Sequence, residues 1–357
     1  MKRKVCILVS LFFTISTITA CSANQQQNIG KYAMNTTNTI KTNSEIKLLE
    51  NSLLTVQFEG DYYFDKYIEQ GGASSDKEVI QFLKDNILSN IDIEFQSNTF
   101  GCSTISSLGT NKLFGRNFDW NYCNALIVQS KPPVGYASIS TVNMDFIQTN
   151  AGFSLDLLPD NMKTIAALYA PLDGMNEKGL CVAVNMISDN TTIEQNSSKP
   201  DITTTTAIRL LLDKAANVEE AIALLQQYDM HASMGMMVHF AISDTSGKSV
   251  AVEYINHEMV VTETPILTNF YVSEGEKYGI GSKQSHERYD ILTKALSGNH
   301  NMTVEQMKNA LDSVSKDNFN EYESTEWSIV FNQTSGEVVY YHREDYQNGY
   351  SFHVKEW

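Results

Sequence analysis

The sequence predicts an α+β fold in which helices are layered on antiparallel sheets. Its 357 residues are 42% hydrophobic and 10% aromatic, a composition typical of a globular protein with one large core. After residue 102, short β-type runs alternate with turn residues, and two helical stretches interrupt them. Because strands and helices are segregated along the chain, this pattern favours α+β over alternating β and α units.

The predicted strands follow from short hydrophobic runs bounded by turn residues. Residues 244–247 (Asp-Thr-Ser-Gly) and 332–336 (Asn-Gln-Thr-Ser-Gly) are typical of hairpin turns. The strands are expected at residues 112–117, 125–129, 137–141, 180–187, 238–243, 249–255, 327–332 and 337–342.

The two helical stretches carry recognisable caps. Residues 207–228 have helical periodicity that is broken or recapped at Asn217. Residues 304–314 follow Thr303 and Gln306, which have the spacing of a capping box. We see no internal repeat in the chain.

The segment before residue 102 is also globular in part. It contains a strand-like run at residues 53–58 and a helix opened by the capping-box pair Ser75 and Glu78. Residues 21–45 are rich in Asn, Gln and Thr and are predicted to be a flexible tether. We therefore expect four parts: signal peptide 1–20, tether 21–45, pre-segment 46–101 and catalytic domain 102–357.

The N-terminus has the pattern of an export signal. A basic start at residues 2–4 precedes an apolar run at 5–18, which is short for a membrane-spanning helix. Residues 18–21 (Ile-Thr-Ala-Cys) resemble a bacterial lipobox. This resemblance implies cleavage before Cys21, a lipid on Cys21, and a protein anchored to the bacterial cell membrane outside the cytoplasm. The alternative is an ordinary secreted protein in which Cys21 has no such role.

Charge and cysteine content limit the partners. The chain has 26 Lys and Arg against 42 Asp and Glu, a net charge of −16, which argues against nucleic acid as a partner. Cys6 leaves with the signal and Cys21 is expected to be lipidated. Cys102, Cys123 and Cys181 remain, an odd number, so at least one thiol stays unpaired within the chain.

Several short motifs occur in a definite order. They are residues 100–106 (Phe-Gly-Cys-Ser-Thr-Ile-Ser), 113–120 (Leu-Phe-Gly-Arg-Asn-Phe-Asp-Trp), 173–180 (Asp-Gly-Met-Asn-Glu-Lys-Gly-Leu), 265–269 (Pro-Ile-Leu-Thr-Asn) and 285–289 (Ser-His-Glu-Arg-Tyr). Together they resemble the choloylglycine hydrolase family of linear amide C–N hydrolases. That family includes bile salt hydrolases, penicillin V acylases and, more distantly, acid ceramidase and N-acylethanolamine amidase.

The resemblance implies the four-layer αββα sandwich of N-terminal-nucleophile hydrolases, with two antiparallel sheets between helical layers. It implies that Cys102 is the nucleophile, exposed by self-cleavage after Gly101. Asp119 resembles the carboxylate that binds the new α-amino group, and Arg116 resembles the cation that favours the thiolate. The alternatives are a turn or capping role for Asp119, a surface salt bridge for Arg116 and a plain chain turn for Gly101.

The same resemblance supplies the rest of the site. Asn269 resembles the side-chain donor of an oxyanion hole, and Asn185 resembles the position whose backbone N–H completes it, although its register is one residue short of some relatives. Arg288 resembles a late arginine near the nucleophile. Its Arg-Tyr sequence also suits an ordinary helix start.

Elementary chemistry agrees with this site. A cysteine at a chain start combines a thiol of pKa ~8.5 with an α-amino group of pKa ~7.7–8.0, so one residue supplies both nucleophile and base. The expected reaction is hydrolysis of a small N-acyl amide through a thioester. We expect no cofactor and no metal, since no His-x-x-x-His pair occurs.

Alternatives remain open at this stage. Cys102 could serve a papain-like peptidase with a remote histidine such as His239 or His342. The chain could also be an unprocessed, lipid-anchored binding protein. An export signal and a long segment before the cysteine distinguish this chain from bile salt hydrolases, so the acyl and amine groups of the substrate stay open. The sequence also leaves open whether the reaction is hydrolysis or acyl transfer, whether residues 46–101 are retained, and whether the protein is a homo-oligomer.

Overall fold

The computed structural model describes residues 45–88, 93–96, 101–149, 157–317 and 323–356. The expected signal peptide, Cys21 and all but the last residue of the expected tether lie outside these residues. The expected lipid site therefore stays a prediction.

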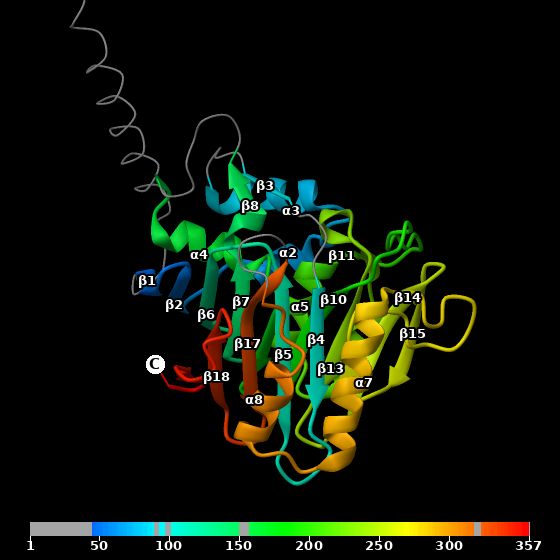
Figure 1. The fold of residues 1–357 in the computed structure, drawn as a ribbon. Coiled ribbons are helices and arrows are strands. Elements are labelled where there is room, and N and C mark those ends of the chain that lie inside the picture. The colour runs from blue at the N-terminus through cyan, green and yellow to red at the C-terminus, as the bar shows by residue number, and fades with distance from the viewer. Residues whose placement is uncertain (1–44, 89–92, 97–100, 150–156, 318–322, 357) are drawn as a thin grey trace, which may run out of the picture. The chain divides into compact units, whose positions relative to one another are not determined.

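The larger sheet has nine strands in the order β1-β2-β6-β7-β9-β10-β13-β14-β15 (Figure 1). Its strands are β1 (Lys47–Glu50), β2 (Leu53–Glu59), β6 (Ala125–Lys131), β7 (Ser138–Asn143), β9 (Asp173–Asn176), β10 (Cys181–Met186), β13 (Val238–Ser243), β14 (Ser249–Ile255) and β15 (Glu258–Glu263).

The second sheet has six strands in the order β16-β4-β5-β17-β18-β19, and all its pairs are antiparallel. Its strands are β16 (Ile266–Leu267), β4 (Gly101–Ser106), β5 (Leu113–Trp120), β17 (Ser324–Asn332), β18 (Glu337–His342) and β19 (Tyr350–His353). Two further sheets have two strands each. One pairs β3 (Ile93–Phe95) with β8 (Ile147–Thr149), and the other pairs β11 (Asp201–Thr203) with β12 (Asp229–His231).

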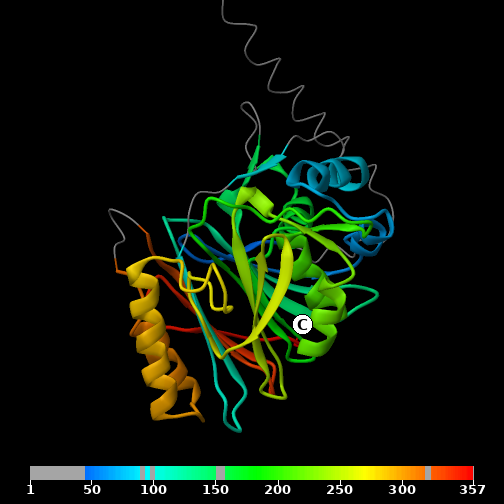
Figure 2. The same ribbon diagram turned by 90° about the vertical axis from the view of Figure 1, so that its right-hand side faces the viewer.

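Helices cover the outer faces of both large sheets, as Figure 2 shows. α4 (Asp160–Leu168), α5 (Thr204–Lys214) and α6 (Val218–Leu225) contact strands of the nine-stranded sheet. α7 (Lys283–Gly298) and α8 (Val304–Asp312) contact β4, β5, β16 and β17 of the six-stranded sheet. The predicted four-layer αββα sandwich is thus confirmed.

One strand pair departs from the predicted antiparallel sheets. β2 and β6 run parallel over seven residue pairs, from Leu53↔Ala125 to Glu59↔Lys131. The physical reason is that β2 and β6 are not joined by a hairpin. The chain between them passes through α2 (Phe64–Glu69), α3 (Asp76–Leu83) and two strands of the other sheet, and a long crossover permits parallel pairing.

The caps that the sequence predicts set the helix boundaries. Thr303 and Gln306 form a capping box at the start of α8, and the Asn217 side chain accepts the Glu220 amide at the start of α6. Asn217 therefore divides the predicted helix 207–228 into α5 and α6. α4 and α7 are helices that the sequence analysis missed.

The pre-segment belongs to the same core as the rest of the chain. Leu53, Phe58, Tyr67 and Leu83 are fully buried or nearly so, and they pack in one cluster with residues of β6, β10 and β13. The expected cleavage point before Cys102 therefore falls inside a shared core and within a strand, at a point where no domain boundary exists.

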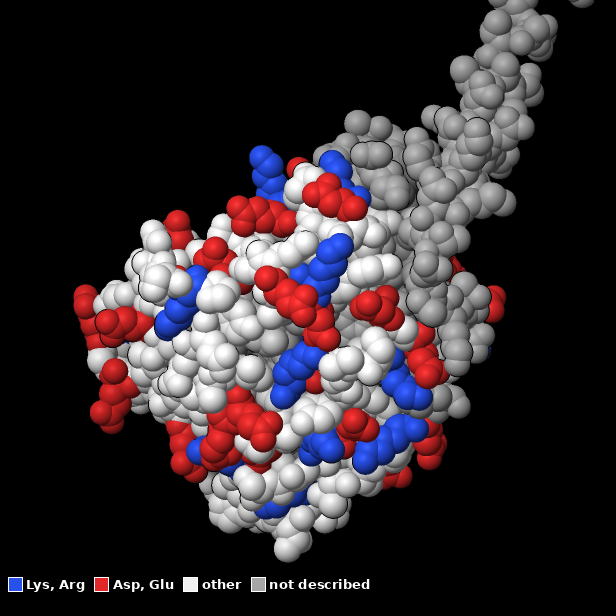
Figure 3. All heavy atoms as spheres, turned by 180° about the vertical axis from the view of Figure 1, so that it is seen from behind, with Lys and Arg blue, Asp and Glu red and all other residues white. Residues whose placement is uncertain are grey.

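The surface is mixed in charge. The face shown in Figure 3 carries acidic side chains interspersed with basic ones, without a continuous basic stripe. In the described part of the chain, no helix combines the length and apolar character needed to cross a membrane.

Glu326 gives the fold a testable pH dependence. It is 1% exposed on β17, and burial raises its pKa from 4.5 to about 7, against the opposing effect of Arg343. Because the pKa of Glu326 is higher in the folded than in the unfolded state, its protonation stabilises the folded state. This contribution is fully present below pH 4.5 and is lost as pH rises through about 7.

We expect the free energy of unfolding to fall more steeply between pH 5 and pH 8 in wild type than in Glu326→Gln, by on the order of 2 kcal/mol. Urea unfolding at both pH values measures this difference. Parallel pH profiles for the two proteins would contradict it.

Candidate active site

Cys102 is the second residue of β4, between β16 and β5 of the six-stranded sheet. Its side chain is fully buried and its thiol is free. Cys123 and Cys181 are also free and buried. The nucleophile that the sequence predicts therefore lies inside the molecule while the Gly101–Cys102 bond is intact.

The pairing of β4 with β5 separates the neighbours of Cys102 into two groups. Cys102 pairs with Phe118 and Thr104 with Arg116, whereas Gly101 pairs with Asp119. Paired residues share a face and successive residues alternate. Cys102 and Arg116 therefore face the nine-stranded sheet, and Asp119 faces the helices α7 and α8.

Arg116 joins the two sheets beneath the thiol. Its Nη1 donates to Asn185 Oδ1 at 2.6 Å, its Nη2 to the Val184 carbonyl at 2.8 Å, and its Nε lies 3.4 Å from Asp173 Oδ2. Arg116 and Asp173 are both fully buried. The surface salt bridge considered for Arg116 is thus excluded by its burial.

Asn269 and Arg288 hold the backbone on both sides of Cys102. The Cys102 amide donates to Asn269 Oδ1 at 2.9 Å, and Arg288 Nη2 donates to the same oxygen at 2.7 Å. Arg288 Nη1 donates to the Cys102 carbonyl and to Ser103 Oγ, both at 2.5 Å. Asn269 Nδ2 donates to the Met186 carbonyl at 2.7 Å.

Asn269 therefore presents its oxygen to residue 102, whereas an oxyanion hole needs an N–H donor. Asn185 enters the site through its side chain, which binds Arg116 and donates to the Leu267 carbonyl at 3.0 Å. The oxyanion roles of both asparagines stay predictions for the cleaved chain.

Asp119 is surrounded by charged groups close to Gly101. Its Oδ1 accepts a hydrogen bond from Thr325 Oγ1 at 2.7 Å, and its Oδ2 lies 3.6 Å from both Arg288 Nη1 and Lys316 Nζ. Among the described residues, none hydrogen-bonds to Asp119 Oδ2, which is buried. A turn or capping role does not account for this environment.

Lys316 and Glu323 were missed by the sequence analysis. They form an ion pair of 2.7 Å, and a Cβ atom on Gly101 would lie 2.7 Å from Lys316 Nζ and 2.3 Å from Glu323 Oε1. A side chain at position 101 would therefore require the ends of the Lys316 and Glu323 side chains to shift. Neither residue lies in a motif, so no local signal in the sequence identifies them.

Burial controls the protonation of the Cys102 thiol. It raises the pKa of the Cys102 thiol to about 11, with Arg116 acting in the opposite direction and Asp119 in the same direction. In the uncut chain the thiol is protonated at neutral pH.

The two candidate histidines of a Cys/His peptidase have other partners. His239 contacts Glu253 Oε1 and the Thr268 carbonyl, each at 2.9 Å. His342 contacts Glu50 at 3.1 Å and Ser52 Oγ at 3.4 Å. The hydrogen bonds of the described residues join neither ring to Cys102, which disfavours the papain-like alternative.

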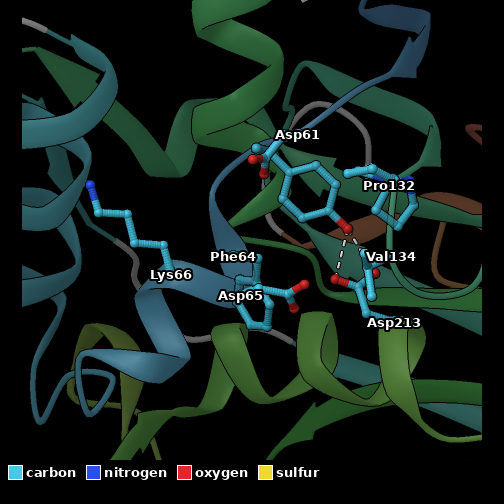
Figure 4. Close-up of a pocket in the computed structure, with 9 residues that line it drawn as sticks. Asp61, Phe64, Asp65, Lys66, Pro132, Val134 and Asp213 are labelled. Carbon is cyan, nitrogen blue, oxygen red and sulfur yellow. Dashed lines mark hydrogen bonds between the residues drawn. The ribbon is translucent and has the colours of Figure 1, made fainter. Parts of the chain in front are cut away.

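A small pocket lies away from these residues (Figure 4). It is lined by residues that include Asp61, Tyr62, Lys66, Val134 and Asp213, and the Tyr62 hydroxyl donates to Asp213. None of the predicted site residues lines it.

Across the described ranges, no group of three or more His, Cys, Asp and Glu residues is arranged to hold a metal ion.

Removing Arg116 should destabilise the fold strongly. We expect Arg116→Leu to lower the free energy of unfolding by ~3–5 kcal/mol, because Asp173 would remain as a buried charge without its cation. Chemical denaturation measures the loss.

The control is Lys131→Leu, which removes an ion pair whose side chains are 48% and 47% exposed. It should cost less than ~1 kcal/mol. Similar losses for the two variants would show that Arg116 has no special structural role.

Comparisons with known proteins agree with the fold and with the motifs. A family model described as acyl-coenzyme A:6-aminopenicillanic acid acyl-transferase matches residues 165–345. Penicillin V acylase of Pectobacterium atrosepticum is 29% identical over 110 residues, which cover 27% of this chain and 29% of that protein. The match thus spans less than a third of this curated relative.

Solved structures extend the likeness over more of the chain. A mutant of conjugated bile acid hydrolase from Clostridium perfringens has a TM-score of 0.53 at 18% identity, covering 71% of this chain and 92% of the other. Penicillin V acylase from Agrobacterium tumefaciens has a TM-score of 0.52 at 16% identity, covering 72% and 86%. These structures show that the fold is that of the N-terminal-nucleophile hydrolases. With the family model matching half of the sequence, the chain belongs to the acyl-coenzyme A:6-aminopenicillanic acid acyl-transferase family.

Proposed function

We propose that this protein hydrolyses the C–N bond of a linear amide with Cys102, after cleavage of its own chain between Gly101 and Cys102. Family membership and the likeness to a penicillin V acylase and a conjugated bile acid hydrolase support this chemistry. The substrate would be a small N-acyl amide, in which an acyl group is joined to an amine.

The observation that carries the proposal is the buried Asp119 Oδ2. It is an acceptor next to Gly101, and no described residue hydrogen-bonds to it. A buried carboxylate oxygen without a donor is costly. Cleavage before Cys102 would create an α-amino group close to Asp119, and an N–H of this group would supply the missing donor.

After cleavage, Cys102 would act as both nucleophile and base. Its α-amine accepts the thiol proton, and the thiolate adds to the amide carbon while Arg116 favours the negative sulfur. Collapse of the tetrahedral intermediate breaks the C–N bond, and the amine leaves with the proton. Water then cleaves the thioester to give the free acid and the thiol.

Acyl transfer is the second candidate reaction. The family model is named for an acyl-transferase, and the same thioester would be cleaved by an amine in place of water. The two reactions share every step up to the thioester. Product analysis with and without an added amine distinguishes them.

The first test is whether cleavage and hydrolysis both depend on Cys102. We expect the purified protein to contain a fragment that begins at Cys102 and to hydrolyse at least one of glycocholate, penicillin V and a long-chain acyl amide. Cys102→Ala should lack both the cleavage and the hydrolysis. Intact mass and product release measure the two properties.

Two controls separate the competing explanations. Cys123→Ser removes another buried thiol and should retain both properties. His342→Gln should also retain them, whereas a Cys/His peptidase that uses His342 would lose its activity. An uncleaved and inactive wild-type protein would favour the binding-protein alternative.

We further propose that residues 46–101 are retained after cleavage. β2 is an interior strand of the nine-stranded sheet, and the Tyr62 hydroxyl donates to Asp213 in α5 at 2.7 Å. Removing this segment would expose the apolar residues that pack in one cluster with Phe58, Tyr67 and Leu83.

We therefore expect the two fragments to co-elute under native conditions and to separate only in denaturant. Size-exclusion chromatography followed by mass analysis checks this. A stable, active preparation that lacks residues 46–101 would contradict retention.

Lipid anchoring at Cys21 is proposed from the lipobox resemblance alone. In bacterial cells, we expect the full chain to incorporate a labelled fatty acid and to be recovered in the membrane fraction. Cys21→Ala should abolish both. Equal labelling of both proteins would remove this proposal and leave the catalytic one untouched.

A further inference from the structure

Three neighbouring strands of the nine-stranded sheet carry polar side chains that face the active site in a row. Asn185 on β10 lies opposite His239 on β13, and Glu253 follows on β14. All three side chains are 0% exposed. Buried polar groups of this kind require partners, and their partners identify what the row does.

The partners lie in one short segment of chain, residues 267–273. Asn185 Nδ2 donates to the Leu267 carbonyl at 3.0 Å, and His239 Nε2 lies 2.9 Å from the Thr268 carbonyl oxygen. The backbone amides of Val272 and Ser273 donate to Glu253 Oε1 and Oε2, at 2.9 and 2.8 Å. Asn269 lies between these attachment points.

His239 and Glu253 also bind each other. His239 Nδ1 lies 2.9 Å from Glu253 Oε1. Both ring nitrogens of His239 therefore lie within hydrogen-bond distance of an oxygen atom, one on Glu253 and one on Thr268. The neighbouring His239 and the amide donors hold the pKa of Glu253 below its usual value, despite burial.

We propose that His239 and Glu253 are positioning residues that hold the segment 267–273 so that Asn269 meets Cys102. This inference rests on the proposed function for its catalytic meaning and on the hydrogen bonds above for its geometry. His239 fixes the carbonyl immediately before Asn269, and Glu253 fixes the amides that follow it. Neither side chain would contact the reacting atoms.

The position of Asn269 relative to Cys102 matters because a small displacement would weaken their contact. Its Oδ1 is 2.9 Å from the Cys102 amide nitrogen, and an error of about 1 Å at a catalytic group can cost on the order of 100-fold in rate. α7 holds the other side of the segment, since Ser285 Oγ accepts from the Asn269 amide at 3.0 Å. Without His239 and Glu253, the segment would be held near Asn269 by the remaining contacts with Asn185, Ser285, Arg288 and Met186.

The test replaces the pair by apolar residues. In the double variant His239→Leu/Glu253→Leu no buried charge is left without its partner, so the fold should survive. We expect kcat to fall at least tenfold while KM stays within twofold. The matched control is His231→Leu/Asp201→Leu, which removes another histidine–carboxylate pair of 2.8 Å, between β12 and β11, and should keep kcat within twofold.

A second variant covers the case in which the double variant fails to fold. Glu253→Gln keeps the size of the side chain but leaves at least one of its amide or ring donors without an acceptor. We expect a several-fold decrease in kcat with unchanged KM. A wild-type kcat in either folded variant, or an equal fall in the control, would overturn the inference.

A structural readout decides the inference without any enzyme activity. In crystals of the Cys102→Ser protein, the distance from Asn269 Oδ1 to the amide nitrogen of residue 102 should stay near 2.9 Å. Adding His239→Leu/Glu253→Leu should lengthen it beyond 3.5 Å. If the distance does not change, the positioning role is wrong. If wild type hydrolyses no amide, the proposed function is wrong, and this distance still tests the positioning.

Discussion

The hydrogen bond from the Cys102 amide to Asn269 Oδ1 is the contact on which the account of this site depends. It joins the first residues of β4 to a segment that is far away in sequence. Arg288 binds both partners, through the Cys102 carbonyl and the Asn269 oxygen. Because two donors converge on Oδ1, the amide group of Asn269 is fixed, and its Nδ2 points to the Met186 carbonyl.

The six-stranded sheet places two sets of charges on opposite sides of the nucleophile. Arg116 lies on the thiol side, where it lowers the pKa that burial raises. Arg288 and Lys316 lie on the backbone side, each 3.6 Å from Asp119 Oδ2. This division follows from the alternation of side chains along β4 and β5. One face would serve the thiolate and the other the new α-amine.

Local signals in the sequence predicted much of the fold. The hairpin turns that end in Gly247 and Gly336 have positive φ at those glycines, which is the conformation that the turn residues indicate. Helix α7 was missed because its buried positions begin with Ser285 and Arg288, and only later positions such as Leu292 are apolar. A helix that turns polar residues toward a site lacks the usual apolar stripe.

The candidate site could be predicted only as far as its motifs reach. The motifs contain Cys102 and Asn269, and the structure brings them into contact. His239 and Glu253 lie in ordinary strand sequences, and their role depends on which distant carbonyls and amides face them. The parallel pairing of β2 with β6 was missed for the same reason, since a long crossover leaves no local signal.

The most direct measurement is a crystal structure of an active preparation, in which both the backbone before Cys102 and the partners of Asp119 are observed. The account predicts a free α-amino group on Cys102 within about 3.2 Å of Asp119 Oδ2, as in a charge-assisted hydrogen bond. An active protein with the Gly101–Cys102 bond intact, or with the α-amino group directed away from Asp119, would contradict it.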